Sequence, residues 1–208
     1  MKTLDEIGCA VGTDRASNGI HNYLGTYEEF VNPMRRLPIV LLEMGVFQGA
    51  GLRMWSEYFT SPDARIVGID TGRDFPFGQI GMPADGRVTA KQGSQSDGAF
   101  LGTLPARFDV VIDDAGHTAA EQMIAFELLW PRVKPWGLYF LEDLHTAWSS
   151  DHCNGPCTIM GWLWMLLADM QDHRGAQGMA KRDAGDKWDS IDTVTVRKGM
   201  AVFRKQRT

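Results

Sequence analysis

An apolar run that ends in one acid and three glycines occupies residues 40–51: Val40-Leu41-Leu42-Glu43-Met44-Gly45-Val46-Phe47-Gln48-Gly49-Ala50-Gly51. A parallel strand that is buried on both faces needs apolar side chains without alternation, so residues 39–42 are predicted to form one. The three glycines provide bare backbone for a close ligand and positive φ for a turn. Apolar residues with helical spacing begin at Leu52. The stretch therefore predicts a strand, a glycine loop and a helix N-terminus, which suits a ligand at the carboxyl ends of the strands.

A second acid ends the next apolar run, Arg65-Ile66-Val67-Gly68-Ile69-Asp70. An acid about 20 residues beyond a glycine loop is placed to contact a ribose diol. The spacing alone fits a dinucleotide or S-adenosylmethionine. The glycines depart from the Gly-x-Gly-x-x-Gly pyrophosphate pattern, and Glu43 would repel a phosphate but attract an ammonium group. Both details favour S-adenosylmethionine, and a plain structural turn is the alternative for the glycine loop.

The bulk properties of the 208 residues are those of an ordinary globular domain, with 44% hydrophobic and 23% charged residues. The formal charge of −5 gives no reason to expect nucleic acid or an anionic membrane as a partner. No apolar run reaches the ~18 residues of a membrane span, and the first residues do not resemble a signal peptide, so a cytoplasmic protein is expected.

Cys9, Cys153 and Cys157 do not suggest a disulfide framework. His152 with Cys153 and Cys157 would be half of a zinc site, but an ordinary loop role is favoured because further ligands are not evident.

The other elements follow from periodicity and turn residues. Strands are predicted at residues 65–70, 88–92, 108–112 and 138–141, and helices are predicted at 99–104, 119–130 and 158–170. Irregular loops are predicted at 72–87 and 175–187. A C-terminal hairpin is predicted from 190–196 and 200–203. Residues 1–38 are interpreted as a loop and a helix that act as a lid beside the glycine loop. The whole chain, 1–208, is predicted to be a single α/β domain with a catalytic core at 39–208. Its sheet is doubly wound and mostly parallel, with an antiparallel C-terminal hairpin. The apolar helix at 158–170 suggests a homo-oligomer.

Acidic residues follow two neighbouring predicted strands. Asp114, Glu142 and Asp143 would lie close together there, and carboxylates so placed repel one another unless a cation lies between them. Three oxygen donors favour Mg²⁺, then Mn²⁺ or Ca²⁺, and such an ion could lower the pKa of a substrate hydroxyl. His117 could then take the proton. The alternative is that Asp113 caps a helix while His117, Glu142 and Asp143 are solvated loop residues.

Eight motifs carry a resemblance to a known family: Gly12-Thr13-Asp14, His21 with Tyr23, Leu42-Glu43-Met44-Gly45, Leu52-Arg53-Met54-Trp55, Gly68-Ile69-Asp70, Gln92-Gly93-Ser94-Gln95-Ser96-Asp97, Ile112-Asp113-Asp114 with His117, and Leu141-Glu142-Asp143-Leu144. With these motifs the chain resembles class I S-adenosylmethionine-dependent methyltransferases with a Rossmann-like fold. It is most similar to the metal-dependent sugar O-methyltransferases of macrolide pathways, the macrocin and mycinamicin type. Arg15, where that family usually has lysine, and Ala115-Gly116 depart from the pattern.

The resemblance implies a role for each matching residue. Glu43 and Asp70 would contact the amino acid and ribose of the cofactor, and Ser94 and Gln95 its adenine. Thr13, Tyr23, Gly45, Gly49 and Asp113 would complete the cofactor site. Asp114, Glu142 and Asp143 would hold Mg²⁺, and His117 would be the base. The acceptor would be a small hydroxyl compound, such as a glycosylated natural product or a nucleotide sugar.

Three rival functions stay open at this point. A catechol- or phenol-type O-methyltransferase uses a metal ion in a similar way, and a nicotinamide-dependent oxidoreductase can be built on the same type of sheet. A methyltransferase-like domain that binds without catalysis is the non-enzymatic alternative.

Overall fold

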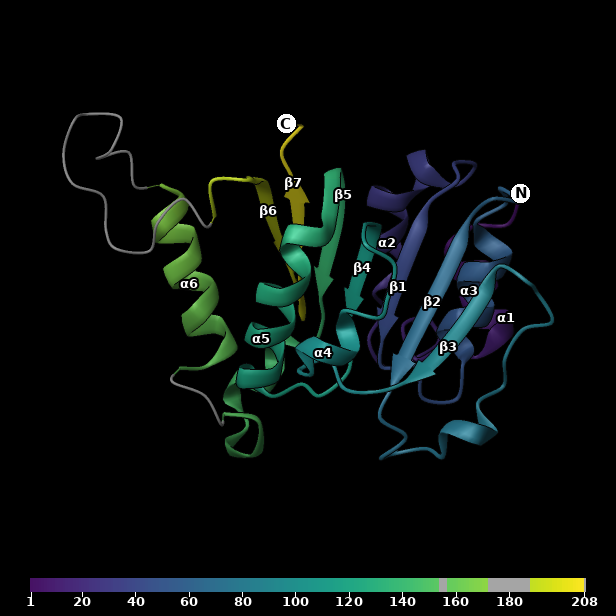
Figure 1. Cartoon of the computed structure of the whole chain (residues 1–208), viewed down its shortest axis with the longest axis horizontal. Coiled ribbons are helices and arrows are strands. Elements are labelled where there is room, and N and C mark those ends of the chain that lie inside the picture. Colours follow the sequence, from purple (N-terminus) through teal and green to yellow (C-terminus); the bar gives the residue numbers. More distant parts are fainter. Residues whose placement is uncertain (154–156, 172–187, 208) are drawn as a thin grey trace.

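The computed structural model describes residues 1–153, 157–171 and 188–207. In these residues, seven strands form one sheet in the order β3-β2-β1-β4-β5-β7-β6 (Figure 1). The first five strands in sequence pair in parallel: β1 (Val40–Met44), β2 (Arg65–Asp70), β3 (Val88–Gln92), β4 (Phe108–Asp113) and β5 (Val133–Leu141). β6 (Ile191–Arg197) and β7 (Met200–Lys205) form a hairpin, and β7 pairs antiparallel with β5. The doubly wound fold and its C-terminal hairpin are thus confirmed.

Helices cover both faces of this sheet (Figure 1). α1 (Leu4–Val11), α2 (Leu24–Val31) and α3 (Ala50–Tyr58) pack on one face. α4 (Gly98–Leu101), α5 (Ala119–Leu129) and α6 (Ile159–Met170) pack on the other. Leu41 and Leu42 of β1 belong to different cores, because successive side chains of a strand point to opposite faces. This two-sided burial explains the unbroken apolar runs.

Helix α1 lies in a segment that the sequence predicts as a loop. Thr3 and Glu6 form a reciprocal capping box, in which the Thr3 amide donates to Glu6 Oε2 at 2.8 Å and the Glu6 amide donates to Thr3 Oγ1 at 3.1 Å. Leu4 and Ile7 are buried in the core that α3 shares. The apolar side chains of residues 1–38 thus help to build this core, and lid movement of this segment stays a prediction.

The remaining elements differ from the predicted ones mainly at their ends. Asp97 caps α4, and Thr118, rather than Asp113, caps α5. β5 begins at Val133, before the strand predicted at 138–141, and Trp136 within it has φ 63°. The connections contain short 3₁₀ helices: η1 (Asn32–Met34), η2 (Phe77–Gln79), η3 (Trp130–Arg132), η4 (Leu144–Trp148) and η5 (Ser150–His152). The loop predicted at 175–187 lies outside the described residues.

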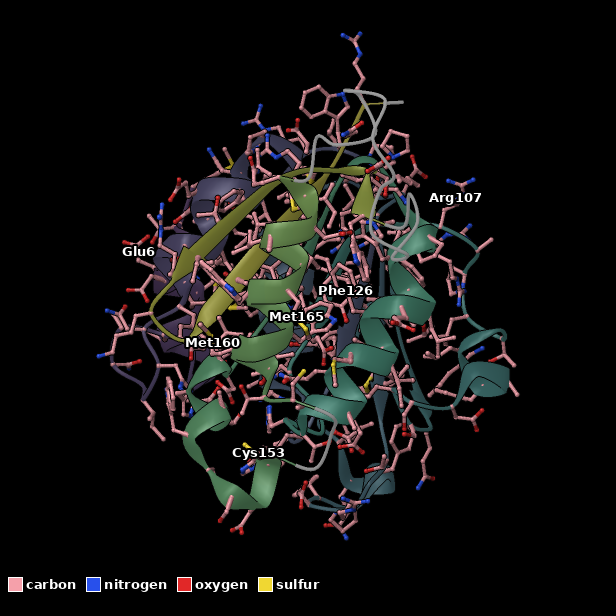
Figure 2. All side chains as sticks on the ribbon, turned by 90° about the vertical axis from the view of Figure 1, so that its left-hand side faces the viewer. Glu6, Arg107, Phe126, Cys153, Met160 and Met165 are labelled. Carbon is pink, nitrogen blue, oxygen red and sulfur yellow. The ribbon has the colours of Figure 1, made fainter. Side chains whose placement is uncertain are left out.

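Helix α6 is the most apolar helix of the fold, and its N-cap is Thr158. Figure 2 looks onto α6 and α5, with Met160 and Met165 on α6 and Phe126 beside them. The helices of the described ranges are all too short or too polar to cross a membrane.

Candidate functional site

The glycine loop after β1 lies against the loop after β4. Gly45 has φ +88°, and a Cβ atom at this position would lie 1.8 Å from the Asp114 carbonyl oxygen. The Asp114 amide donates to the Met44 carbonyl at 3.1 Å. Only a residue without a side chain permits this approach and this backbone conformation. Gly49 then begins α3 in the left-handed conformation. The glycine loop after β1 and the acidic end of β4 are therefore in direct backbone contact.

Glu43 is buried at the end of β1, directly beneath α3. A Cβ atom at Gly51 would lie 2.2 Å from Glu43 Oε1, so the third glycine makes room for this carboxylate. Oε1 accepts from Arg15 Nη1 at 2.6 Å, whereas the buried Oε2 has no hydrogen-bond partner among the described residues. Burial raises the pKa of Glu43, and Arg15 opposes that effect. The orphaned oxygen fits an ammonium donor from a ligand.

Arg15 joins three acids that come from three different strand ends. Besides Glu43, its guanidinium donates through Nε to Glu142 Oε1 at 2.8 Å and through Nη2 to Asp114 Oδ2. Burial alone would lower the pKa of Arg15, but Asp114, Glu142 and Glu43 raise it further than burial lowers it, so Arg15 stays charged. The sequence marks Arg15 only as a departure from a family pattern. A single buried arginine in a loop has no periodicity that could predict its partners.

Asp114, His117 and Asp143 form the cation-competent group of the site. Each offers one ligand atom, and these atoms lie within 4.8 Å of one another. His117 Nδ1 is 3.5 Å from Asp143 Oδ2, and His117 Nε2 is 4.0 Å from Asp114 Oδ1. Burial lowers the pKa of His117. The structure thus brings together three of the four residues that the sequence groups around a metal.

Both His117 and Asp143 have left-handed backbones, with φ 53° and 59°. Such conformations are costly for residues other than glycine and persist where the surrounding structure holds them. In this fold, both left-handed residues direct their side chains into the cation-competent group.

Glu142 lies next to the group but is directed elsewhere. Its Oε1 accepts from Arg15 and from the Tyr27 hydroxyl, and its side chain is buried. Burial raises the pKa of Glu142 to about 7, against the effect of Arg15. Tyr27 is a buried residue of α2 whose hydroxyl makes this contact. Metal ligation by Glu142 stays a prediction.

Asp70 closes the glycine loop from the β2 side. Its Oδ2 accepts from the amides of Val46 and Phe47, both at 2.9 Å, and its Oδ1 accepts from the Gly72 amide at 2.7 Å. Phe47 has a left-handed backbone and packs against Phe75 of the loop after β2, with ring centroids 5.6 Å apart. Asp70 therefore fixes the glycine loop. Its predicted contact with a ribose would be made in addition to these three hydrogen bonds.

Asp113 and Gln95 form a buried pair on the other face of the sheet. Asp113 accepts from the Tyr139 hydroxyl at 2.8 Å and from Gln95 Nε2 at 3.2 Å, while Gln95 Oε1 accepts from the Gly116 amide at 2.9 Å. Burial raises the pKa of Asp113 to about 7, although the Tyr139 hydrogen bond opposes the shift. These contacts fix the loop that leads to His117. Direct cofactor contact by Asp113 and Gln95 stays a prediction.

The remaining predicted cofactor residues lie in two places. Ser94 exchanges a hydrogen bond of 2.9 Å with Ser96 in the loop after β3. Thr13 is buried and contacts Asp14 Oδ1 at 3.4 Å. The Tyr23 hydroxyl donates to Asp143 Oδ1 at 3.2 Å, which places Tyr23 beside the metal group.

The alternative zinc half-site of His152, Cys153 and Cys157 gains no further ligands from the described residues, because the metal-competent group contains neither cysteine. Both cysteines are free, as is Cys9. Cys153 Sγ lies 3.3 Å from the Ala147 carbonyl oxygen. Cys153 therefore has an ordinary loop contact.

Comparisons with known proteins agree with this geometry. Residues 42–144, which contain the glycine loop and the acids, match the family described as a methyltransferase domain. The chain therefore carries a methyltransferase domain of the Rossmann-like fold.

Two curated relatives extend the similarity over most of the chain. The 8-demethyl-8-(2-methoxy-alpha-L-rhamnosyl)-tetracenomycin-C 3'-O-methyltransferase of Streptomyces olivaceus is 38% identical over 72% of this chain and 40% of its own length. The mycinamicin VI 2''-O-methyltransferase of Micromonospora griseorubida is 32% identical over 73% of this chain and 40% of its own length. The chain thus spans about two fifths of the length of these relatives.

A solved structure is similar over nearly the whole chain. The MycE methyltransferase from the mycinamycin biosynthetic pathway, in complex with Mg, SAH and mycinamycin VI, superposes with a TM-score of 0.80. The two proteins are 26% identical, and the match covers 99% of this chain and 54% of MycE. That protein binds Mg and S-adenosylhomocysteine on the fold found in this chain.

Proposed function

We propose that this chain is an S-adenosylmethionine-dependent, Mg²⁺-dependent O-methyltransferase that acts on a sugar hydroxyl of a glycosylated natural product or nucleotide sugar. The observation that carries the proposal is the grouping of Asp114, His117 and Asp143 at the ends of β4 and β5, with the Asp114 backbone in contact with the glycine loop. Relatives named as sugar O-methyltransferases support the acceptor class.

The residues around the glycine loop fit the methyl donor. The Oε2 of Glu43, which has no hydrogen-bond partner among the described residues, can accept from the donor's ammonium group, and Gly51 makes room for the carboxylate. Asp70, which holds the loop amides, is placed at the β2 edge for a ribose. The donor supplies an activated methyl group on a sulfonium.

The metal group fits Mg²⁺ because Asp114 and Asp143 offer hard oxygen donors, the kind that this ion prefers. When bound, the ion would lower the pKa of an acceptor hydroxyl and fix its position. Asp114 and Asp143 would hold it, with Glu142 as a further candidate ligand.

His117 would receive the proton of the acceptor hydroxyl, and this role is supported by its burial, which lowers its pKa and favours the neutral imidazole. The acceptor oxygen would form a bond to the methyl carbon, the carbon–sulfur bond would break, and the proton would stay on His117.

The experiment combines binding with turnover. Calorimetry should show tight binding of S-adenosylhomocysteine and not of NAD, and methylation of a rhamnoside should exceed that of catechol and stop with EDTA. His117→Ala should lower kcat by about 10²–10⁴-fold while S-adenosylhomocysteine still binds. Full activity in His117→Ala or in Asp114→Ala would refute the mechanism. Cofactor binding without turnover of any hydroxyl would favour the non-catalytic alternative.

We also propose a cytoplasmic location and self-association. Three free cysteines fit a reducing compartment. Exposed apolar side chains gather on α5 and α6, namely Ile124, Leu128, Trp164 and Met165. This face of the molecule is shown in Figure 2. A monomeric mass by light scattering would reject the proposed assembly.

A further inference from the structure

The two oxygens of the Asp143 carboxylate have different neighbours. His117 approaches Oδ2, as described above. Around Oδ1 lie three rings: the Tyr23 hydroxyl at 3.2 Å, His145 Nδ1 at 3.8 Å and His21 Nδ1 at 4.0 Å. Tyr23 and His21 are stacked with ring centroids 5.0 Å apart, and the His21 and His145 centroids are 6.0 Å apart. We call Tyr23, His21 and His145 the ring ladder.

The ring ladder leads from the interior to the surface. Tyr23 is buried, the His21 side chain is 22% exposed and the His145 side chain is 58% exposed. The rings therefore reach solvent beside a carboxylate of the candidate metal group. The proposed methyl transfer assigns no role to His21 or His145. Neither belongs to the metal-competent group of the described residues, so the ladder does not complete a second cation site.

One carboxylate lies beside the ring ladder, and two exposed apolar residues lie near it in the sequence. The carboxylate of Asp14 lies 3.8 Å from His21 Nε2, and its side chain is 59% exposed. Ile20, next to His21, is 86% exposed, and Trp148, at the end of η4 that begins beside Asp143, is 83% exposed. Trp148 and Ile20 thus offer apolar surface to a ligand in solution.

We propose that the ring ladder and Asp14 bind the sugar of the acceptor, and that Trp148 and Ile20 contact its aglycone. A sugar has apolar C–H faces that pack on rings and hydroxyls that pair with carboxylates and imidazoles, and the ladder offers both kinds of group. A sugar on His21 and His145 would have its hydroxyls beside Asp143, across from His117. The inference rests on the proposed function, because it takes the acceptor to be a glycoside.

Two probes separate the sugar from the aglycone: methyl α-L-rhamnoside, which has almost no aglycone, and p-nitrophenyl α-L-rhamnoside. Kinetics with S-adenosylmethionine and Mg²⁺ give KM and kcat, and saturation-transfer NMR on the S-adenosylhomocysteine complex reports binding without turnover. His21→Ala and His145→Ala should raise KM for both probes about tenfold, equivalent to about 1.4 kcal/mol of binding. His21→Phe, which retains a ring, should recover most of the loss.

Trp148→Ala should raise KM about tenfold for the aryl glycoside alone. The matched control is Trp136→Ala, which removes an exposed tryptophan at the amino end of β5, at the opposite edge of the sheet. This control should leave both KM values unchanged. Unfolding midpoints of all variants distinguish a lost contact from a damaged fold.

The outcomes separate the inference from the proposed function. Unchanged KM and NMR signals in His21→Ala, His145→Ala and Trp148→Ala would overturn the inference while the methyltransferase proposal stands. NMR binding that depends on His21 and Trp148, without methylation by the wild type, would support the binding surface and refute the activity. Neither binding nor methylation of either rhamnoside would overturn both.

Discussion

Arg15 and Arg87 each gather several partners with one guanidinium, but the partners differ in kind. Arg15 binds the carboxylates of Glu43, Asp114 and Glu142. Arg87 donates to three backbone carbonyl oxygens at the end of α3, those of Ser56, Phe59 and Ser61, and to the carboxylate of Asp85. Arg15 is almost fully buried, whereas Arg87 is partly exposed.

The difference separates a functional arrangement from a structural one. The last carbonyl groups of a helix have no partner within the helix, so an arginine that binds carbonyls there completes the local fold. Buried acids gathered around an arginine carry a large desolvation cost and are not needed to complete a helix or strand. The partners of a buried arginine thus indicate whether it serves a fold or a site.

Replacing Arg15 should have the largest effect. Arg15→Met leaves three buried acids without their cation and should lower the free energy of unfolding by about 3–5 kcal/mol, measured by urea denaturation without ligands. Arg15→Lys retains the charge and should recover part of this loss. Wild-type stability of Arg15→Met would show that the acids do not need the guanidinium.

Removing the divalent ion should have the next largest effect. Arg15 compensates only part of the charge of the four carboxylates at the site, so Mg²⁺ should stabilise the folded protein. At a concentration 100 times its Kd, the gain over EDTA should be about 2.7 kcal/mol. Asp143→Asn should abolish the gain, and Arg87→Met should retain it. An equal gain in Asp143→Asn would place the ion elsewhere.

Arg87→Met tests the structural side of the comparison. The loss of its carbonyl contacts should cost about 1–3 kcal/mol. Affinities for S-adenosylhomocysteine and Mg²⁺, measured by calorimetry, should not change. Arg36→Met is the control, because among the described residues this exposed arginine has a hydrogen bond only to the Met1 sulfur. Its free energy of unfolding should stay within about 0.5 kcal/mol of the wild-type value. A change in cofactor affinity in Arg87→Met would contradict the separation.

Replacing Asp85 should have the smallest effect on the free energy of unfolding, and this effect should be measurable only at acidic pH. Hydrogen bonds from Arg87 and Ser56 lower the pKa of Asp85 below its ordinary value of 3.8. An acid with a lowered pKa in the folded state stabilises above its unfolded pKa, and this stability is lost as the pH falls below about 4. Between pH 5 and 3 the wild type should therefore lose more stability than Asp85→Asn, by less than about 1 kcal/mol. Parallel pH profiles of the two proteins would reject this.

Elements with a strong local pattern were predicted closely from the sequence. Residues 65–70 and 88–92 are strands with the predicted bounds, because both segments are short and bounded by turn residues. Helix α1 was missed although Thr3 and Glu6 have the spacing of a capping box, the signal that could have revealed it. The start of β5 was missed because Pro135 and Gly137 are typical of a turn, while pairing with β4 extends the strand through them.

The sequence by itself determined the sheet, the glycine loop and the proximity of Asp114, His117 and Asp143, because apolar runs mark strands and parallel strands end at one edge. Only the tertiary structure decided that Arg15 occupies the space between Glu43, Asp114 and Glu142, and that His21 and His145 meet at Asp143. The contacts of Arg15 with Glu142 and of His21 with Asp143 join residues more than 100 positions apart, and loop side chains carry no periodicity that would reveal such partners.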